Sequence, residues 1–458
     1  MFLGREKYLH ALKRLVSRPG MQTALIYGRR RIGKSELVKQ VLRGATSRKI
    51  YYACRQVAEA SSAAGLSALI SEQYDLPKLG YTRIEEVLEY LFKLAVTDEL
   101  ILVIDEYPYL RENVKGMDSI LQSLIDKYRD ISQIKCIIVD SYIGVMKELI
   151  THASPLYGRM DFVLDLKQMN YREASLFYPN FSDEDKVRMY SVFGGVPYYN
   201  RLVDDSISVR ENITALIASP GARLENEVPM YLGAEIAKLA NANEVFSTLA
   251  QGYSRYSDIL SHSHVSSGPT LADILERLIK MDIVKKISPI NDSKNKKKTG
   301  YYICDNLSLF YYKYIFKYSS QMKIMDSSLF YDRYINNDFE ENFVPHMFED
   351  ICVQYLIEKN IRGEITPAFF NIGKYYYDDP VNKKKGEFDI VTEDELGYVF
   401  YEVKFKKDQI PIRAVQKEIE RVRMTGLKCR KYVFISQSGL AECTLENVTS
   451  IPLQALYL

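Results

Sequence analysis

Two groups of residues that could do chemistry lie far apart in this chain of 458 residues. Near the start, residues 28–35 (GRRRIGKS) fill the pattern G-x-x-x-x-G-K-[ST], in which backbone N–H groups and the lysine surround phosphates. Near the end, the stretch GEFDIVTEDELGYVFYEVKFKK carries Asp389, and then Glu402 and Lys404 two residues apart. Two carboxylates and a lysine could hold a Mg²⁺ ion and activate water. The sequence therefore predicts one nucleotide site and one metal-dependent site.

The nucleotide site needs a strand before the phosphate loop and a helix after it. Residues 23–27 (TALIY) have the composition of a short buried strand, and residues 34–43 (KSELVKQVLR) that of a helix. Lys34 is expected to reach the β- and γ-phosphates of ATP, and the Ser35 hydroxyl to bind Mg²⁺. The residues that we expect to bind ATP in this loop are Gly28, Arg29, Arg30, Arg31, Ile32, Gly33, Lys34 and Ser35.

A second apolar run, ELILVIDEYPYL, ends in two carboxylates where a parallel strand would meet its carboxyl edge. Asp105 suits a role in holding the Mg²⁺ ion of ATP, and Glu106 is positioned to polarise an attacking water. The run IKCIIVDSYIGVM predicts a further strand, with Ser141 at its end as a candidate sensor of the γ-phosphate.

The composition is that of an ordinary globular chain of about two to four domains. Its net charge of +2 means that any basic surface for nucleic acid must be local. The six cysteines are scattered without a C-x-x-C pair, which argues against a zinc ribbon and favours a reducing compartment. Since no signal region and no apolar run of about 18 residues is present, we expect a cytoplasmic protein without a membrane partner.

The metal-dependent site needs strands that bring its residues together. After a helical run that contains Glu349, strand-like runs at FFNIGKYYY, GEFDIVTED and GYVFYEVKF precede a helix at IRAVQKEIERVRMTG and a strand at KYVFISQ. If GEFDIVTED and GYVFYEVKF pair as a hairpin, Asp389, Glu402 and Lys404 converge, because residues two apart share a face. Glu349 is placed to join Asp389 and Glu402 as a ligand of Mg²⁺.

The middle of the chain is mostly helical. Residues 166–236 suit a helical lid, and three short helices followed by a strand pair at 237–318 have the outline of a winged helix. The lysine-rich loop at 294–298 lies where a wing could follow a phosphate backbone. Alternatively, the module only packs and relays, and the loop is solvated.

In combination, these motifs resemble the AAA+/STAND-type P-loop ATPases that are abundant in archaea and bacteria. The resemblance rests on FLGREKYLHAL, GRRRIGKS, LVIDEYPYL, SPLYGRM and GGVPYYN, and it covers nearly the whole chain. It implies that the box Gly4-Arg5-Glu6 lies beside the base and that Pro197 is a lid residue contacting nucleotide. Pro197 could equally end a turn between two helices. Asp140 departs from the family, in which a small residue usually precedes the sensor serine.

The resemblance also places the family's arginine after the sensor strand at Arg159. As an arginine finger, Arg159 would stabilise transition-state charge from a neighbouring chain or after closure, which would imply a nucleotide-dependent homo-oligomer. As a structural residue, it would pair with Asp161 or another surface acid. The sequence leaves both roles open.

The C-terminal constellation resembles the PD-(D/E)xK nuclease fold, as found in a poorly characterised domain, of the DUF234 type, that follows this ATPase type. Asp389 takes the Asp position, Glu402 and Lys404 take the E-x-K positions, and Phe388 replaces the usual proline. We thus expect an α/β protein with a P-loop core (1–165), a helical lid (166–236), a winged helix (237–318) and a restriction-endonuclease-like domain (319–458). The expected function is an ATPase that uses Mg²⁺ and controls a DNase. The alternative is a regulatory or signalling ATPase whose C-terminal modules bind partners or DNA without cutting.

Overall fold

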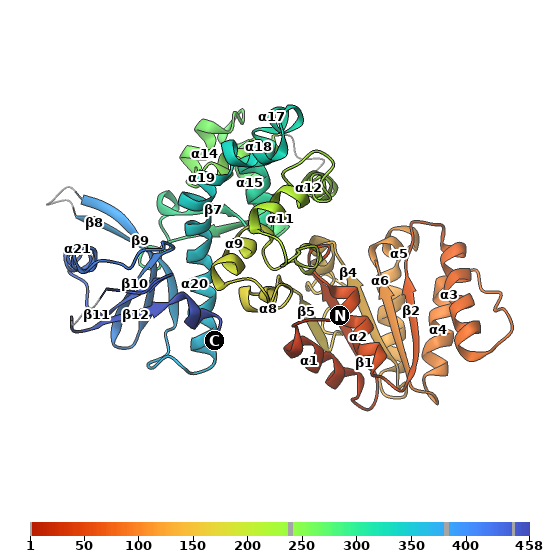
Figure 1. Cartoon of the computed structure of the whole chain (residues 1–458). Coiled ribbons are helices and arrows are strands. Elements are labelled where there is room, and N and C mark those ends of the chain that lie inside the picture. Colours follow the sequence, from red (N-terminus) through yellow and green to blue (C-terminus); the bar gives the residue numbers. More distant parts are fainter. Residues whose placement is uncertain (1, 237–240, 380–383, 442–444) are drawn as a thin grey trace. The chain divides into compact units, whose positions relative to one another are not determined.

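The computed structural model describes residues 2–236, 241–379, 384–441 and 445–458 (Figure 1). It divides into two compact units. The first unit comprises Met1–Met169 together with Val196–Tyr198, and the second comprises Asn170–Gly195 and Tyr199–Leu458. Among the described residues, no helix combines the length and the apolar character that a membrane crossing requires.

The first unit is built on a five-stranded parallel sheet with the strand order β2-β3-β4-β1-β5. Its strands are β1 (Gln22–Tyr27), β2 (Arg48–Ala53), β3 (Leu100–Asp105), β4 (Lys135–Asp140) and β5 (Phe162–Asp165). The strands β3 and β4 are buried along their whole length, because helices cover both faces of the sheet. The strands predicted from the apolar runs at 23–27, 99–106 and 134–141 are therefore confirmed.

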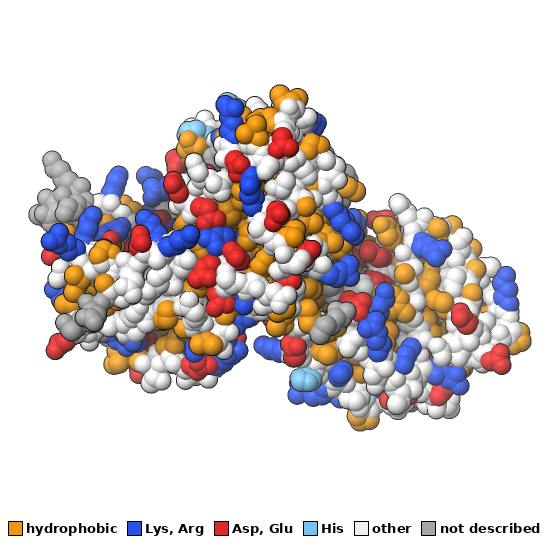
Figure 2. Space-filling view, viewed as in Figure 1, with side chains coloured by type: hydrophobic (Ala, Val, Ile, Leu, Met, Phe, Trp, Pro, Cys, Tyr) orange, Lys and Arg blue, Asp and Glu red, His pale blue; other side chains and the backbone are white. Residues whose placement is uncertain are grey.

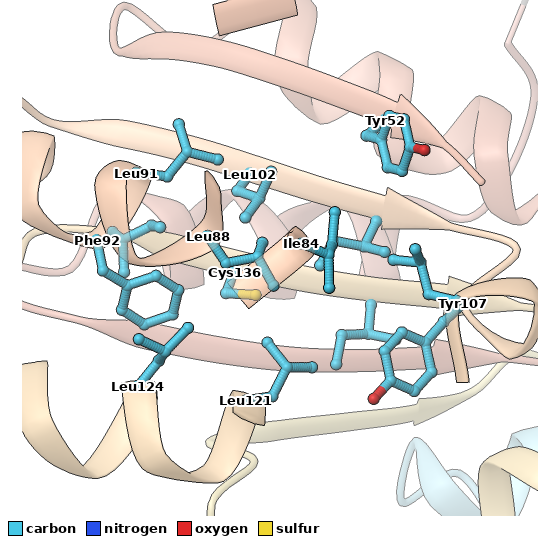
Figure 3. Packing of buried hydrophobic residues seen from close by; sticks show 14 of the residues in the cluster. Tyr52, Ile84, Leu88, Leu91, Phe92, Leu102, Tyr107, Leu121, Leu124 and Cys136 are labelled. Atoms are coloured by element: carbon cyan, nitrogen blue, oxygen red, sulfur yellow. The ribbon is translucent and has the colours of Figure 1, made fainter. Parts of the chain in front are cut away.

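Alternate residues of these strands enter two different cores. Leu25, Leu102 and Ile138 face the larger cluster, which α3 (Glu59–Tyr74), α4 (Ile84–Leu94), α5 (Pro108–Asn113) and α6 (Met117–Tyr128) complete. Figure 3 shows how residues such as Leu88, Phe92 and Leu121 of this cluster pack against the sheet. Their immediate sequence neighbours in the strands face the other cluster, with α1 (Glu6–Val16) and α2 (Lys34–Arg43). This alternation is the reason that the strands read as continuous apolar runs.

The strand register brings the predicted nucleotide residues to one edge of the sheet. Tyr27, the last residue of β1, pairs with Asp140, the last residue of β4, and Asp105 at the end of β3 pairs with Val139. The segments that follow these three ends carry the phosphate loop, Glu106 and Ser141. Parallel sheets bind ligands outside the carboxyl ends of their strands, so this edge is where a nucleotide site belongs.

The second unit begins with helices that the sequence predicted as a lid. They are α8 (Tyr171–Ser175), α9 (Asp183–Phe193), α10 (Pro197–Asn200, which starts in the first unit), α11 (Val209–Leu216) and α12 (Glu227–Ile236). The predicted boundary between lid and winged helix falls on residues 237–240, which lie outside the described residues. The boundaries predicted at 165/166 and 318/319 remain predictions.

Three helices and a hairpin follow, as the sequence predicted. The helices are α13 (Ala242–Ala250), α14 (Tyr256–His262) and α15 (Gly268–Lys280), and the antiparallel hairpin consists of β6 (Val284–Ile287) and β7 (Gly300–Ile303). We call this set the helix–hairpin module. Lys296–Lys298 form a short 3₁₀ turn, η1, in the hairpin loop.

A long helical run leads from the module to the last sheet. It contains α16 (Asn306–Phe310), α17 (Ser319–Ile324), α18 (Ser327–Tyr334), α19 (Asn336–Asp338) and α20 (Val344–Ile361). Two of its segments, η2 (Tyr311–Phe316) and η3 (Phe339–Phe343), are π-helical. Their aromatic rings pack on one another, with the ring centroids of Tyr314 and Phe343 at 5.7 Å. Such π-helical segments are rare and occur often at functional sites.

The last sheet has the strand order β12-β11-β10-β9-β8. Its strands are β8 (Asn371–Asp379), β9 (Lys384–Asp394), β10 (Gly397–Lys404), β11 (Cys429–Ser436) and β12 (Val448–Pro452), with α21 (Ile412–Arg423) between β10 and β11 and the 3₁₀ turn η4 (Leu453–Leu456) at the end. The predicted hairpin of β9 and β10 is present, and only Glu395 and Leu396 separate its strands. The edge strand β12 is an addition to the predicted order.

Candidate active sites

Lys34 lies at the centre of the phosphate loop. Its side chain leaves the first turn of α2, is only 5% exposed, and donates hydrogen bonds to the carbonyls of Gly28 at 2.8 Å and Arg29 at 3.0 Å. It also donates to the hydroxyl of Ser141 at 2.8 Å. The structure thus brings the predicted loop lysine and the predicted sensor serine into direct contact, although they are far apart in the chain.

Glycine is required where the chain turns from β1 into the loop. Gly28 has a φ of 152°, and a Cβ atom built on it would clash with the carbonyl oxygen of Leu166. A residue with a side chain would have to displace that backbone. Gly33, with a φ of 95°, precedes α2, so the helix N-terminus points into the loop, where it favours a bound phosphate.

The charges around Lys34 are strongly perturbed by burial. Burial lowers the pKa of Lys34 to about 8, although the nearby carboxylates of Asp140, Asp105 and Glu106 oppose this shift. Burial likewise raises the pKa of Asp140 to about 7, aided by Glu106 and opposed by the hydrogen bond from the Tyr142 backbone. Asp140, the departure from the family pattern, thus adds a carboxyl that can be neutral near neutral pH.

Ser35 and Asp105 meet at the edge of the sheet. The Ser35 hydroxyl donates to a carboxylate oxygen of Asp105 at 3.0 Å, and the Tyr51 hydroxyl donates to the same oxygen. A hydroxyl and a carboxylate oxygen are ligands of the kind that Mg²⁺ prefers, so these two residues fit the ion that would accompany ATP. Tyr51 was not predicted, because only the placement of β2 beside β3 brings it to Asp105.

Glu106 follows directly in a left-handed backbone conformation, with a φ of 58°. Its backbone N–H donates to the other oxygen of Asp105 at 3.1 Å, and its side chain is half-buried at the loop edge. A non-glycine residue in this conformation turns the chain sharply at the end of β3. Its predicted role toward water remains a prediction.

Two further predicted elements touch the loop. A guanidinium nitrogen of Arg5, from the Gly4-Arg5-Glu6 box, lies 3.4 Å from the carbonyl of Ile32. Pro197 lies 3.7 Å from the position that a Cβ of Gly33 would occupy, and the Arg31 guanidinium stacks on Tyr198 at 4.3 Å from the ring centroid. Pro197 and Tyr198, which belong to the first unit, therefore lie beside the loop.

Arg159 lies at the opposite edge of the same sheet. Its guanidinium forms a two-pronged ion pair with Asp126, at 2.9 and 2.8 Å, and not with Asp161. Its carbonyl accepts from Thr23, which is four residues before the end of β1, a rise of about 13 Å. In this structure Arg159 therefore lies at the sheet edge away from its own phosphate loop, and its role as an arginine finger remains a prediction.

In the last sheet, Asp389 and Glu402 lie where two strands separate. The pairing of β9 with β10 ends at Ile390 and Tyr401, while β9 continues to pair with β8 and β10 with β11. Asp389 and Glu402 are the next residue on each strand beyond that last pair. We call this point the fork. A register shift of β9 against β8, between Tyr375 and Gly373, also occurs at this place.

Each carboxylate at the fork is engaged by a lysine. Glu402 is 22% exposed and pairs with Lys404 at 2.6 Å, and Asp389 is 47% exposed and lies 3.7 Å from Lys374. Burial raises the pKa of Glu402, with a further contribution from Asp389 and opposition from Lys404. Glu418 of α21 influences both Glu402 and Lys404 more strongly than Asp389 does, whereas Asp389 is influenced mainly by Glu349, Lys374 and Glu387. That the three predicted residues form one site remains a prediction.

Glu349 approaches from α20. Burial raises the pKa of Asp389, and Glu349 is the largest electrostatic contributor to that rise. The Glu349 carboxylate lies 3.5 Å from the His346 ring, and this contact raises the pKa of His346.

The oxygen donors of Glu349, Asp389 and Glu402 suit Mg²⁺ chemically. Within the described residues, however, no three His, Cys, Asp or Glu side chains are gathered as a metal site. Each of these carboxylates has a basic partner that an ion would have to displace.

The lysine-rich hairpin loop is docked on the same sheet. The Ile290 N–H donates to the Lys374 carbonyl at 2.8 Å, and the Asn291 side chain bonds both backbone groups of Tyr376, at 2.7 and 3.1 Å. Lys298 stacks on the Tyr376 ring at 3.8 Å and pairs with Asp292 at 2.9 Å. The loop covers the outer edge of β8, which limits its predicted role as a free wing.

Two segments of the chain match known protein families. Residues 2–202 match a family described as an ATPase domain predominantly from Archaea, and residues 311–421 match DUF234, described as archaeal and bacterial proteins of unknown function. An uncharacterised protein of Methanocaldococcus jannaschii is 26% identical over 439 residues, which is 93% of each chain.

Solved structures also resemble this chain. The Walker-type ATPase PABY2304 of Pyrococcus abyssi superposes with a TM-score of 0.51 at 18% identity, over 68% of this chain and 96% of that one. The ORC2 protein of Aeropyrum pernix gives a TM-score of 0.49 at 14% identity, over 67% of this chain and 91% of that one.

The two matches agree with the motifs, since residues 2–202 resemble ATPase domains found predominantly in Archaea and residues 311–421 resemble DUF234. The family match agrees with the convergence of loop, strand end and serine at one sheet edge.

Proposed function

We propose that this protein hydrolyses ATP at the phosphate loop and thereby switches a Mg²⁺-dependent nuclease site at the fork, which acts on DNA. The observation that carries the ATPase part is the convergence of Lys34, Ser35, Asp105 and Ser141 at one edge of the sheet. The match of residues 2–202 to a family of ATPase domains supports the same activity.

The residues of the loop have separable tasks in this proposal. Lys34 exchanges its bonds to the loop carbonyls for bonds to the β- and γ-phosphates, and Ser141 donates to the γ-phosphate. Ser35 and Asp105 hold Mg²⁺, which neutralises phosphate charge when bound. Glu106 orients a water and takes up its proton, while the water oxygen bonds to the γ-phosphorus and the bond from that phosphorus to the bridging oxygen breaks. The products are ADP and phosphate.

Glu106→Gln tests this assignment. The amide keeps the size of the side chain but cannot take up a proton, so the variant should bind ATP and hydrolyse it at least about 100-fold more slowly. Nucleotide titration and steady-state hydrolysis measure the two effects separately. An unchanged hydrolysis rate would remove Glu106 from the reaction.

At the fork, Asp389 and Glu402 would hold Mg²⁺, with Glu349 as a third ligand from α20. Lys404 would then leave its ion pair with Glu402, position a water and offset charge on the phosphate. The water oxygen would bond to phosphorus while the bond from phosphorus to the leaving sugar oxygen breaks, and the proton released by the water would pass to that sugar oxygen. Support comes from the position of Asp389 and Glu402 on facing strands directly beyond the last β9–β10 pair.

Purified full-length protein incubated with labelled DNA, with and without Mg²⁺ or Mn²⁺ and ATP, tests the nuclease part. We expect metal-dependent cleavage that changes with ATP and is absent in EDTA. Intact DNA under every condition would contradict the proposal, provided that the same preparation hydrolyses ATP.

A second function is favoured by the ion pairs at the fork. Lysines neutralise both carboxylates, and the described part of the chain holds no ready-made group of three metal ligands. A regulatory or signalling ATPase whose C-terminal unit binds partners or DNA without cutting would need no more than this. Binding of DNA without cleavage would support it.

The surface charge bears on how DNA would bind, and the cysteines bear on the cellular compartment of the protein. On the face drawn in Figure 2, Lys and Arg side chains are interspersed with Asp and Glu, in keeping with the small net charge. DNA would therefore be held locally and not by a general basic surface. Cys54, Cys136 and Cys352 are buried and form no disulfide, and a reducing cytoplasmic location is part of the proposal. A role for Arg159 as a finger from a neighbouring chain would require a homo-oligomer.

A further inference from the structure

A chamber of about 640 Å³ lies inside the second unit, between the helix–hairpin module and the last sheet. Lys285 and Tyr302 of the hairpin line one side of it, and Lys374 and Asp389 of the sheet line another. Both π-helical segments reach the same space, through Lys313 of η2 and through Asn342 and Phe343 of η3. Asp389, which we assign to the fork, is thus reached from a cavity that is partly open to solvent.

The chamber walls carry lysines and an aromatic ring, together with the carboxylates of Glu349, Asp350, Glu387 and Asp389. Lys285, Lys313 and Lys374 supply three ammonium groups, held by Asp350 at 3.5 Å, Asp338 at 3.0 Å and Glu387 at 3.0 Å. Phosphate oxygens could replace these carboxylates as partners. The Tyr302 ring, with the Lys374 ammonium 5.7 Å from its centroid, offers an aromatic surface for a base.

Apolar side chains complete the wall beside the ring. Ile287 of the hairpin strand β6 and Ile372 of β8 line the chamber. Proteins that bind single-stranded nucleic acid use the same combination, because cationic side chains contact the phosphates and the bases stack on aromatic side chains.

The size of the chamber selects against a duplex. A volume of this order holds a drug-sized ligand or about one to two nucleotides. Duplex DNA, whose major groove alone is about 12 Å wide, is too bulky for the same space. The hairpin that lines one side of the chamber is also held on β8 through its loop residues Ile290, Asn291 and Lys298.

We propose that the chamber takes an unpaired nucleotide, so that the substrate at the fork is single-stranded nucleic acid or a base flipped out of a duplex. This inference rests on the proposed nuclease function for its place beside Asp389, but the chamber's preference for a single strand is a binding property. It can therefore be tested without cleavage.

The binding test uses the full chain in EDTA, with a labelled oligothymidine and a labelled duplex of the same length, followed by fluorescence anisotropy. Lys285→Ala and Lys286→Ala form a matched pair, because both remove one lysine from β6 but only Lys285 lines the chamber. We expect Lys285→Ala to weaken single-strand binding about fivefold and to reduce its salt dependence by about one unit, with Lys286→Ala within twofold of wild type. Tyr302→Ala should weaken it similarly without altering the salt dependence. Unchanged ATP hydrolysis and unfolding temperature show that each variant is folded.

Equal affinity for both DNAs, or equal losses in the two lysine variants, would overturn the inference. Cleavage assays with Mg²⁺ separate it from the proposed function. Cleavage of duplex and single strand at equal rates overturns the inference and leaves the nuclease intact. Tight, Lys285-dependent binding of a single strand that is never cut supports the chamber and overturns the nuclease.

Discussion

The phosphate loop and the fork each place a lysine near carboxylates, but the two lysines differ in burial, in hydrogen-bond partners and in the direction of their pKa shifts. Lys34 is almost completely buried, bonds carbonyls and a hydroxyl, and has a pKa lowered to about 8 by burial. Lys404 is 47% exposed and pairs directly with Glu402, and although burial acts against it, this pair raises its pKa. The loop lysine is held by neutral groups that a phosphate can replace, whereas the fork lysine is neutralised by a predicted metal ligand.

The different partners of the two lysines mean that the phosphate loop is preorganised for its ligand and the fork is not. At the loop, backbone groups and strand ends fix the geometry, so a nucleotide meets donors that already point inward. At the fork, a metal ion would first have to separate Glu402 from Lys404 and Asp389 from Lys374. We therefore expect substitutions at the loop to have the larger effects, and substitutions at the fork to depend on what opens it.

Lys34→Ala should produce the largest effect. The loop loses the one ammonium group that contacts its carbonyls, so ATP hydrolysis should fall by about 10³-fold or more and nucleotide binding should weaken strongly. Lys39→Ala, on the exposed side of the same helix, removes the same charge and should leave hydrolysis within twofold. Steady-state hydrolysis measures both, and similar rates in the two variants would show that position within α2 does not matter.

Asp389→Asn should separate the two sites. An amide oxygen is a poorer ligand for Mg²⁺ than a carboxylate, so metal-dependent cleavage should fall by about 10²-fold. ATP hydrolysis should be unchanged, because Asp389 belongs to the second unit and the phosphate loop to the first. Glu395→Gln, in the exposed β9–β10 turn, makes the same change of charge and should keep both activities. Loss of ATP hydrolysis in Asp389→Asn alone would show that the sites are not independent.

The same contrast explains how far the sequence could be interpreted. Lys34, Ser35 and Asp105 are predictable, because the loop pattern and the apolar runs before them are local signals. Tyr51 is not predictable from its own neighbourhood, since only the strand order places it on Asp105.

The second unit shows the same limit. The strands β8 to β11 alternate in a way that the sequence reveals, but the docking of Asn291 on Tyr376 joins segments 85 residues apart. The chamber, the register shift in β9 and the pairing of Lys374 with Asp389 arise from such contacts. Hydrophobic periodicity reports only which face of an element is buried, and not against what.

Asp140→Asn tests the raised pKa of Asp140, beside Lys34, through the pH dependence of the free energy of unfolding. Burial raises the pKa of Asp140 from 3.8 to about 7, so the folded state binds a proton that the unfolded state releases. This contribution to stability is complete below about pH 4 and is lost as the pH rises through about 7. The asparagine side chain has no proton to lose, so at pH 8 the variant should be more stable than wild type by roughly 2–4 kcal/mol. At pH 4 the two should differ little.

Thermal or urea unfolding from pH 4 to pH 8, without nucleotide and Mg²⁺, measures the effect. Asp118→Asn, which breaks hydrogen bonds to Tyr107 and Arg111 elsewhere in the first unit, serves as the control and should destabilise the protein at pH 8. A pH-independent difference between Asp140→Asn and wild type would contradict the raised pKa.

Arg159→Ala should have the smallest effect and decides whether the nucleotide site is complete within one chain. Arg159 lies at the sheet edge opposite its own loop, so we expect it to act only on ATP bound to a neighbouring chain. Turnover per wild-type molecule should then rise with protein concentration, and the variant should lack that rise and be about tenfold slower at the highest concentration. At high dilution the two proteins should share one rate. Asp126→Ala provides the matched control, because it breaks the same ion pair but keeps the guanidinium. If the two variants lose stability equally and turnover is independent of concentration in all three proteins, Arg159 only braces α6 against the start of β5. The nucleotide site would then be complete within one chain, with no need of a neighbouring chain.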